Sequence, residues 1–95
     1  MKFAFMIMGD FDTDQDSAVI HEGSARIVGV ASVEEACAEA KNLLEEGIGC
    51  IELCGAFGPE GARQVIRATE GKIPVGYITH LPEQDGLYRT VFGSK

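Results

Sequence analysis

Residues 48–71, with the sequence IGCIELCGAFGPEGARQVIRATEG, constrain the fold of this chain more than any other stretch. A compact apolar run at residues 48–54, bounded by glycines, predicts a buried strand. Pro59 suits the first turn of a helix, where the N–H that proline lacks has no intrahelical partner, and Gly71 marks the end of that helix. The stretch therefore predicts a strand, a glycine turn and a helix, with any reactive site at the turn.

Two strands and a helix are predicted before this stretch. Residues 2–8 alternate apolar side chains on both faces, a pattern typical of a central strand that is covered on both sides. Residues 25–31 form a β-rich run that ends at Ser32. Ser32 and Glu35 have the spacing of a capping box in front of a helix over residues 33–46, whose apolar stripe suits packing on a sheet. A strand therefore leads directly into a helix.

The other segments are less regular. Residues 10–17 are polar and strongly acidic, which predicts a surface loop. Residues 18–24 fit either a short extended piece or irregular chain. Residues 73–81 predict a further strand, and residues 87–92 predict either a short edge strand or an arm that packs elsewhere.

This alternation predicts a single small α/β domain, ordered β-β-α-β-α-β, with a mostly parallel four- or five-stranded sheet. In one arrangement, strands 25–31, 48–54 and 73–81 lie side by side with both helices on one face. In the alternative, the strand at 2–8 lies in the middle with one helix on each face. The first arrangement leaves an apolar sheet face open, so we expect a homodimer, unless residues 87–92 fold back as the cover.

The charge of the chain argues against two classes of partner. Asp and Glu total 15 against 8 Lys and Arg, and the formal net charge of −7 would repel nucleic acid and an anionic membrane surface. No apolar run approaches the roughly 20 residues that span a bilayer, and residues 1–8 lack the features of a signal peptide. We therefore expect a cytoplasmic protein whose cysteines, at positions 37, 50 and 54, are free thiols.

The carboxyl edge of the predicted sheet is the expected place for a ligand. Backbone N–H groups of the glycine turn, together with the following helix N-terminus, suit a small anionic or polar ligand. Pro59 removes a donor and Glu60 adds a negative charge, and the glycines also suit a tight turn with close packing. The ligand-binding residues expected at this edge are Asp10, Gly55, Gly58 and Gly61.

Cys54, His80 and Glu52 form a second, catalytic candidate. Cys54 ends a strand and faces a helix N-terminus, a setting that favours a reactive thiolate, and His80 ends the neighbouring strand as a base. Glu52 would orient His80, and the cluster would act on a small carbonyl or thioester compound. Cys54 is otherwise a buried thiol, and Glu52 otherwise pairs with Arg26 or is solvated at a dimer interface.

No cofactor and no metal site are predicted. The acidic loop begins like a calcium-binding loop, with Asp10, Asp12, Asp14 and Asp16. However, Gln15 stands where the tight turn needs glycine, and His21 stands where a bidentate Glu is needed. A solvated acidic loop is therefore the expectation.

The blocks IELCGAFGPEG, at residues 51–61, and IPVGYITH, at residues 73–80, resemble a known family. It is a family of short prokaryotic proteins catalogued as a domain of unknown function, in which an IELCG-x-FG-x-x-G block recurs. The resemblance covers most of the chain and implies its fold. Two functional hypotheses follow from the sequence. The first is a small-ligand-binding or regulatory domain with its site at the carboxyl edge of the sheet. The second is a small enzyme that uses Cys54 as its nucleophile.

Overall fold

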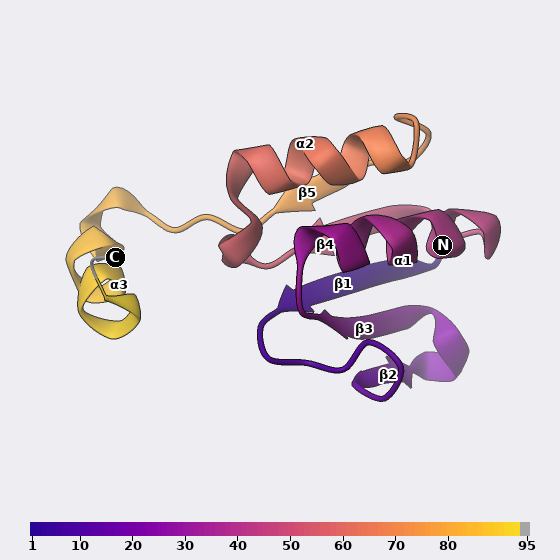
Figure 1. Ribbon diagram of the computed structural model, residues 1–95, viewed down its shortest axis with the longest axis horizontal. Helices are drawn as coiled ribbons and strands as arrows, with labels where there is room; N and C mark the ends of the chain where they lie inside the picture. Colours follow the sequence, from indigo (N-terminus) through magenta and orange to yellow (C-terminus); the bar gives the residue numbers. More distant parts are fainter. Residues whose placement is uncertain (94–95) are drawn as a thin grey trace.

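The computed structural model describes residues 1–93 and confirms a single α/β domain with a mostly parallel sheet (Figure 1). The strands are β1 (Phe3–Met8), β2 (Ser17–Ile20), β3 (Ala25–Val30), β4 (Cys50–Leu53) and β5 (Val75–Tyr77). The helices are α1 (Val33–Glu45), α2 (Gly58–Ala68) and α3 (Asp85–Phe92). Short 3₁₀ turns are η1 (His21–Gly23), η2 (Gly55–Phe57) and η3 (Pro82–Gln84).

The first strand lies in the middle of the sheet. The strand order is β2-β3-β1-β4-β5, and β1 pairs in parallel with both β3 and β4. The prediction that residues 25–31 and 48–54 are neighbours is therefore wrong. The crossover through α1 passes over one strand position, and β1 fills that position. The edge strand β2, which the sequence left open, pairs antiparallel with β3.

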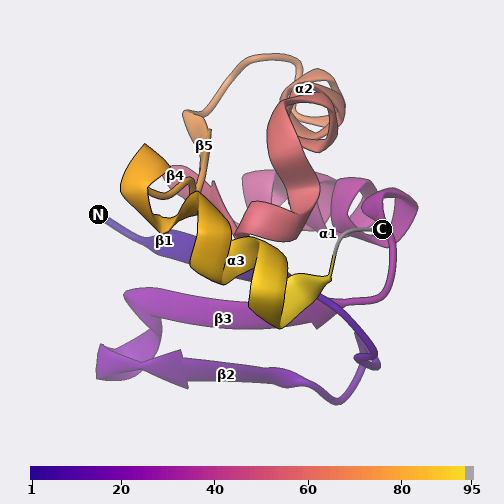
Figure 2. The same cartoon turned by 90° about the vertical axis from the view of Figure 1, so that its left-hand side faces the viewer.

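Both long helices cover the same face of the sheet, where they pack against each other (Figures 1 and 2). The connections β3-α1-β4 and β4-α2-β5 progress along the sheet in the same direction, so right-handed crossovers bring both helices to one side. The prediction of one helix on each face is therefore wrong, although its central β1 is correct.

The core lies in the single layer between the two helices and the sheet. Alternate strand positions point into this layer, because successive side chains of a strand face opposite sides. The fully buried side chains, at 0% exposure, include Ala4, Met6, Val30, Ile51 and Leu53 from the sheet and Ala36, Ala40 and Val65 from the helices.

None of the helices within residues 1–93 covers the opposite side of the sheet, and we call this side the open face. The pairing register brings Phe5 beside both Ile27 and Glu52 on this face, and Phe3 beside Ala25. Ile27 remains 48% exposed and Phe3 38% exposed. The two-sided apolar pattern of β1 therefore indicates a central strand correctly, but only one of its sides is covered within the protomer.

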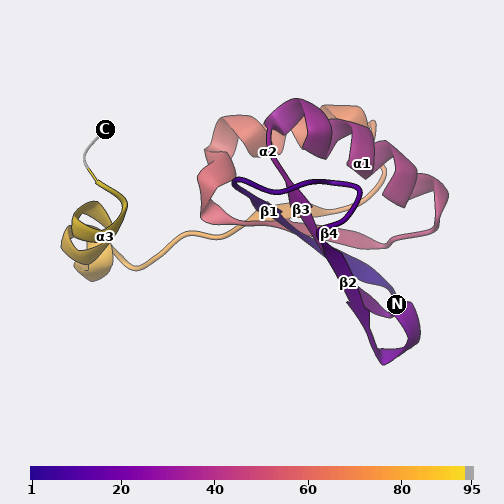
Figure 3. The same ribbon diagram turned by 60° about the horizontal axis from the view of Figure 1, so that its bottom comes forward.

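The C-terminal segment, residues 78–93, forms an arm that ends in α3. Figures 1 and 3 show α3 standing apart from the sheet and its two helices, at the end of an extended connection. The interpretation of residues 87–92 as an edge strand is wrong. The apolar residues fall at helical spacing on one side of α3, and they are Leu87, Tyr88, Val91 and Phe92.

The predicted cap of α1 is confirmed and also secures the acidic loop. Ser32 Oγ accepts a hydrogen bond of 3.1 Å from the Glu35 amide. Glu35 Oε1 accepts one of 2.9 Å from the Ala31 amide and one of 2.7 Å from the Thr13 hydroxyl. The start of α1 is thus joined to a loop about twenty residues earlier.

We expect Glu35 to make the stability of the protein pH-dependent in acid. The Thr13 hydroxyl, and then the Ala31 amide, lower the pKa of the Glu35 carboxyl below its ordinary value of 4.5. Because the folded-state pKa is the lower one, this stabilisation is present above pH 4.5 and is lost as the pH falls through the folded-state value. Chemical denaturation across this range should show a shallower acid decline for Glu35→Gln than for wild type. Glu34→Gln, at an exposed neighbouring position, serves as the control, and equal declines for all three proteins would contradict the expectation.

Candidate functional site

The parallel strands β1, β3, β4 and β5 all end at one edge of the sheet, as the βαβ order requires. Asp10, Ser32 and Cys54 follow three of these strand ends, and the arm leaves the sheet from the fourth. The carboxyl edge therefore carries most of the polar and reactive side chains that the sequence singles out.

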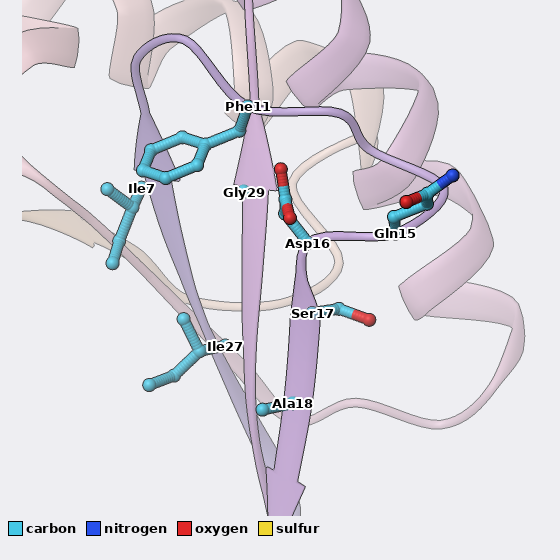
Figure 4. A pocket seen from close by; sticks show the side chains of 8 residues that line it. All are labelled: Ile7, Phe11, Gln15, Asp16, Ser17, Ala18, Ile27 and Gly29. Atoms are coloured by element: carbon cyan, nitrogen blue, oxygen red, sulfur yellow. The ribbon is translucent and has the colours of Figure 1, made fainter.

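An open hollow of about 350 Å³ lies on the open face near this edge (Figure 4). Phe11, from the acidic loop, lies over β3, and Ile7 and Ile27 lie on the same side of the sheet. Gly29 makes room for the ring, because a Cβ placed there would be only 2.7 Å from Phe11 Cγ. The residues that line the hollow are Ile7, Phe11, Gln15, Asp16, Ser17, Ala18, Ile27 and Gly29.

The polar rim of the hollow is formed by the acidic loop. The carbonyl of Asp16 accepts a hydrogen bond of 2.8 Å from the Gly29 amide, which attaches the loop to β3. Asp16 Oδ2 accepts one of 2.7 Å from the Asp12 amide, and Asp12 Oδ1 accepts one of 2.9 Å from the Asp14 amide. The loop is therefore shaped by its own carboxylates. Within residues 1–93, no group of three or more His, Cys, Asp or Glu side chains is placed to hold a metal ion.

The predicted glycine turn has a structural reason for each of its glycines. Gly58 has a φ of +61°, a conformation that side chains disfavour. A Cβ at Gly55 would be 3.3 Å from the Ile78 carbonyl oxygen, and one at Gly61 would be 3.1 Å from Phe57 Cβ. These glycines thus allow a tight turn and close packing, and they lie outside the hollow beside Phe11.

Cys54 and His80 have different partners. Cys54 Sγ accepts a hydrogen bond of 3.3 Å from the Met8 amide, at the end of the neighbouring strand. His80 Nε2 lies 2.7 Å from Asp85 Oδ1, and the imidazole stacks on the Tyr88 ring with centroids 3.7 Å apart. The imidazole therefore belongs to the arm, and the described hydrogen bonds do not join it to the thiol.

Glu52 lies on the open face with Cys50. The Cys50 thiol donates to Glu52 Oε2 at 3.6 Å. Burial, followed by the negative charge of Glu52 and this hydrogen bond, raises the pKa of the Cys50 thiol, so the pair disfavours a thiolate. The predicted pairing of Glu52 with Arg26 is wrong, because Arg26 points to the helix side of the sheet and binds Glu46 at 2.9 Å.

Phe11 and Gly29 are the residues of the candidate site that the sequence did not reveal. Phe11 is the only aromatic residue in the acidic segment DFDTDQDS, which was a signal that this loop returns to the sheet. Its partner Gly29 lies in the middle of a β-rich run, where a glycine often marks a close approach by another part of the chain.

Comparison with known proteins gives a family for this chain. Searches of curated proteins and of solved structures found no match. Within residues 1–93, no helix is both long and apolar enough to cross a membrane. The predicted resemblance to a family of unknown function is confirmed. Residues 1–93 match the family of unknown function DUF6506, and the protein belongs to that family.

Proposed function

We propose that this chain is a small-ligand-binding domain with a regulatory role, and that its ligand occupies the hollow beside Phe11. One observation carries the proposal, namely an open apolar hollow at the carboxyl edge with a carboxylate on its rim. Its volume of about 350 Å³ lies in the range of small-molecule sites. A catalytic role for Cys54 has less support, because His80 is held by the arm.

The chemistry of the hollow favours a ligand with an apolar body and a cationic or hydrogen-bond-donating end. Ile7, Phe11 and Ile27 offer apolar surface, and Asp16 offers an acceptor at the rim. Asp10 precedes Phe11, and the net charge of −7 repels anions. Of the two ligand classes expected from the sequence, a polar ligand therefore suits this hollow better than an anionic one.

A thermal-shift panel tests this proposal. Small aromatic and aliphatic amines should raise the melting temperature, whereas carboxylic acids and sugar phosphates should not. Phe11→Ala should abolish the shift, while Phe3→Ala should retain it. The second variant is a matched control, because Phe3 and Phe11 are both 38% exposed but only Phe11 lines the hollow. A blank panel, or an equal response of both variants, would contradict the proposal.

We also propose that the chain works as a homodimer in the cytoplasm. The open face supports the homodimer, because Phe3 and Ile27 stay partly exposed there and large exposed apolar patches generally mark an interface. Light scattering should give twice the protomer mass of 10.2 kDa, and a mass of 10.2 kDa at micromolar concentration would refute the dimer. Cys37, Cys50 and Cys54 are all free thiols, which accords with a reducing compartment.

A further inference from the structure

Two apolar surfaces of the protomer remain largely exposed within residues 1–93. One is the part of the open face that Phe11 does not cover, including Phe3. The other is the apolar side of α3, whose side chains retain exposures of 60% for Leu87, 39% for Tyr88, 73% for Val91 and 69% for Phe92. An eight-residue helix with this exposure gains little stability from its own sequence, so a packing partner is needed.

The arm is ordered without resting on its own sheet. His80 Nε2 and Asp85 Oδ1 form a hydrogen bond of 2.7 Å, which holds the start of α3 against the connection that precedes it. The His80 ring stacks on Tyr88, and Tyr88 stacks on Phe92 with centroids 5.6 Å apart. Figure 2 shows α3 in front of the sheet and its helices, and Figures 1 and 3 show that it is separated from them. The apolar side of α3 is therefore preformed and remains largely exposed.

We propose that the arms are exchanged between two copies, so that α3 of each copy docks on the open face of the other. The inference rests on the proposed homodimer and specifies the segment that forms it. A two-fold exchange covers both apolar surfaces at once with a closed assembly, whereas a sheet-to-sheet dimer would leave the apolar side of α3 in water.

The area agrees with this occupant. Leu87, Val91 and Phe92 are mostly exposed, and Tyr88 is partly exposed. When the area buried on both partners is counted for two arms, burial of these four side chains reaches the order of the roughly 1,600 Å² of a standard interface.

A pair of neighbouring substitutions in α3 tests the exchange. Val91→Asp places a carboxylate on the apolar side and should weaken the dimer at least about tenfold, as for loss of a central interface residue. Thr90→Asp places the same charge outside the four apolar residues, where the Thr90 hydroxyl donates a hydrogen bond to the Gly86 carbonyl of its own helix, and the dimer should persist. Light scattering over a dilution series measures both, with circular dichroism as the check on folding.

A substitution on the other surface completes the test. Phe3→Asp should weaken the dimer as much as Val91→Asp, because Phe3 belongs to the open face that receives α3 and lies outside the hollow beside Phe11. A dimer that survives either substitution overturns the exchange while the homodimer itself stands. A wild-type protein of 10.2 kDa refutes both proposals together.

Discussion

Replacing Met6 with Ala should lower the free energy of unfolding by about 2–5 kcal/mol, since the deleted side chain leaves a cavity in a packed core. Met6 is 0% exposed at the centre of β1, between the sheet and the two helices. The single apolar layer contains all the fully buried large side chains among the described residues, so the remaining core has little capacity to compensate. Urea denaturation, at a concentration at which the protein is monomeric, measures the change.

The control for this prediction comes from the other side of the sheet. Ile27→Ala removes a side chain of comparable size that is 48% exposed. In the monomer it should therefore lower the free energy of unfolding by less than half as much as Met6→Ala does. Equal costs would show that the open face is covered within one protomer. That result would contradict the layer arrangement itself.

The second large effect is expected at the contact between Phe11 and Gly29. Gly29→Val should lower the free energy of unfolding by about 1–3 kcal/mol, because the added side chain overlaps the Phe11 ring. The new Cβ would lie 2.7 Å from Phe11 Cγ and 3.1 Å from the Asp16 carbonyl oxygen. The added side chain should displace the ring from its place on β3, and the hollow that Phe11 lines should change with it.

A double-mutant cycle tells whether valine at position 29 destabilises the protein through its overlap with the Phe11 ring or for another reason. Phe11→Ala combined with Gly29→Val should be more stable than Gly29→Val alone, because the truncated side chain no longer overlaps. If the losses in free energy of unfolding of the two single variants add up in the double variant, Phe11 does not lie on Gly29 in solution. Loss of the thermal shift in Gly29→Val would further connect this contact to the ligand.

Features that depend on neighbouring residues were predictable from the sequence. The cap of α1 needs only Ser32 and Glu35, and the turn before α2 needs only its glycines and Pro59, so local rules suffice for both. The same rules failed at residues 87–92. Leu87 and Tyr88 with Val91 and Phe92 are as compatible with a helix side as with a packed strand, and so short a segment has too few repeats to decide.

Features that depend on distant residues were not predictable. The pairs Phe5 with Ile27 and Phe5 with Glu52 join segments far apart in the chain, and apolar residues pair well with several partners. The side of the sheet that receives Arg26 follows from this register, since a shift of one residue moves every side chain to the other face. The predicted Arg26–Glu52 pair failed for that reason.

The candidate site also combines features that the sequence predicts with features that it does not. The βαβ order alone brings the ends of the parallel strands to one edge, as the sequence predicts, and a functional site at that edge stays a proposal. The hollow itself depends on where the acidic loop returns to the sheet. Phe11 and Gly29, which meet there, lie far apart along the chain, so no local sequence pattern predicts their contact. The roles of Cys54, Glu52 and the three glycines remain predictions.

The position of β1 between β3 and β4 has a consequence for synthesis on the ribosome. Met8 and Cys54, which meet where β1 and β4 end, are 46 residues apart in the chain. The earliest strand to emerge is therefore among the last to have both of its neighbours. Until β4 has left the exit tunnel, one edge of β1 has no strand to pair with, and its backbone N–H and C=O groups can pair with other nascent chains. Rapid docking of β3 and α1 onto β1 would limit that exposure, so the Ser32 cap that starts α1 also serves the growing chain.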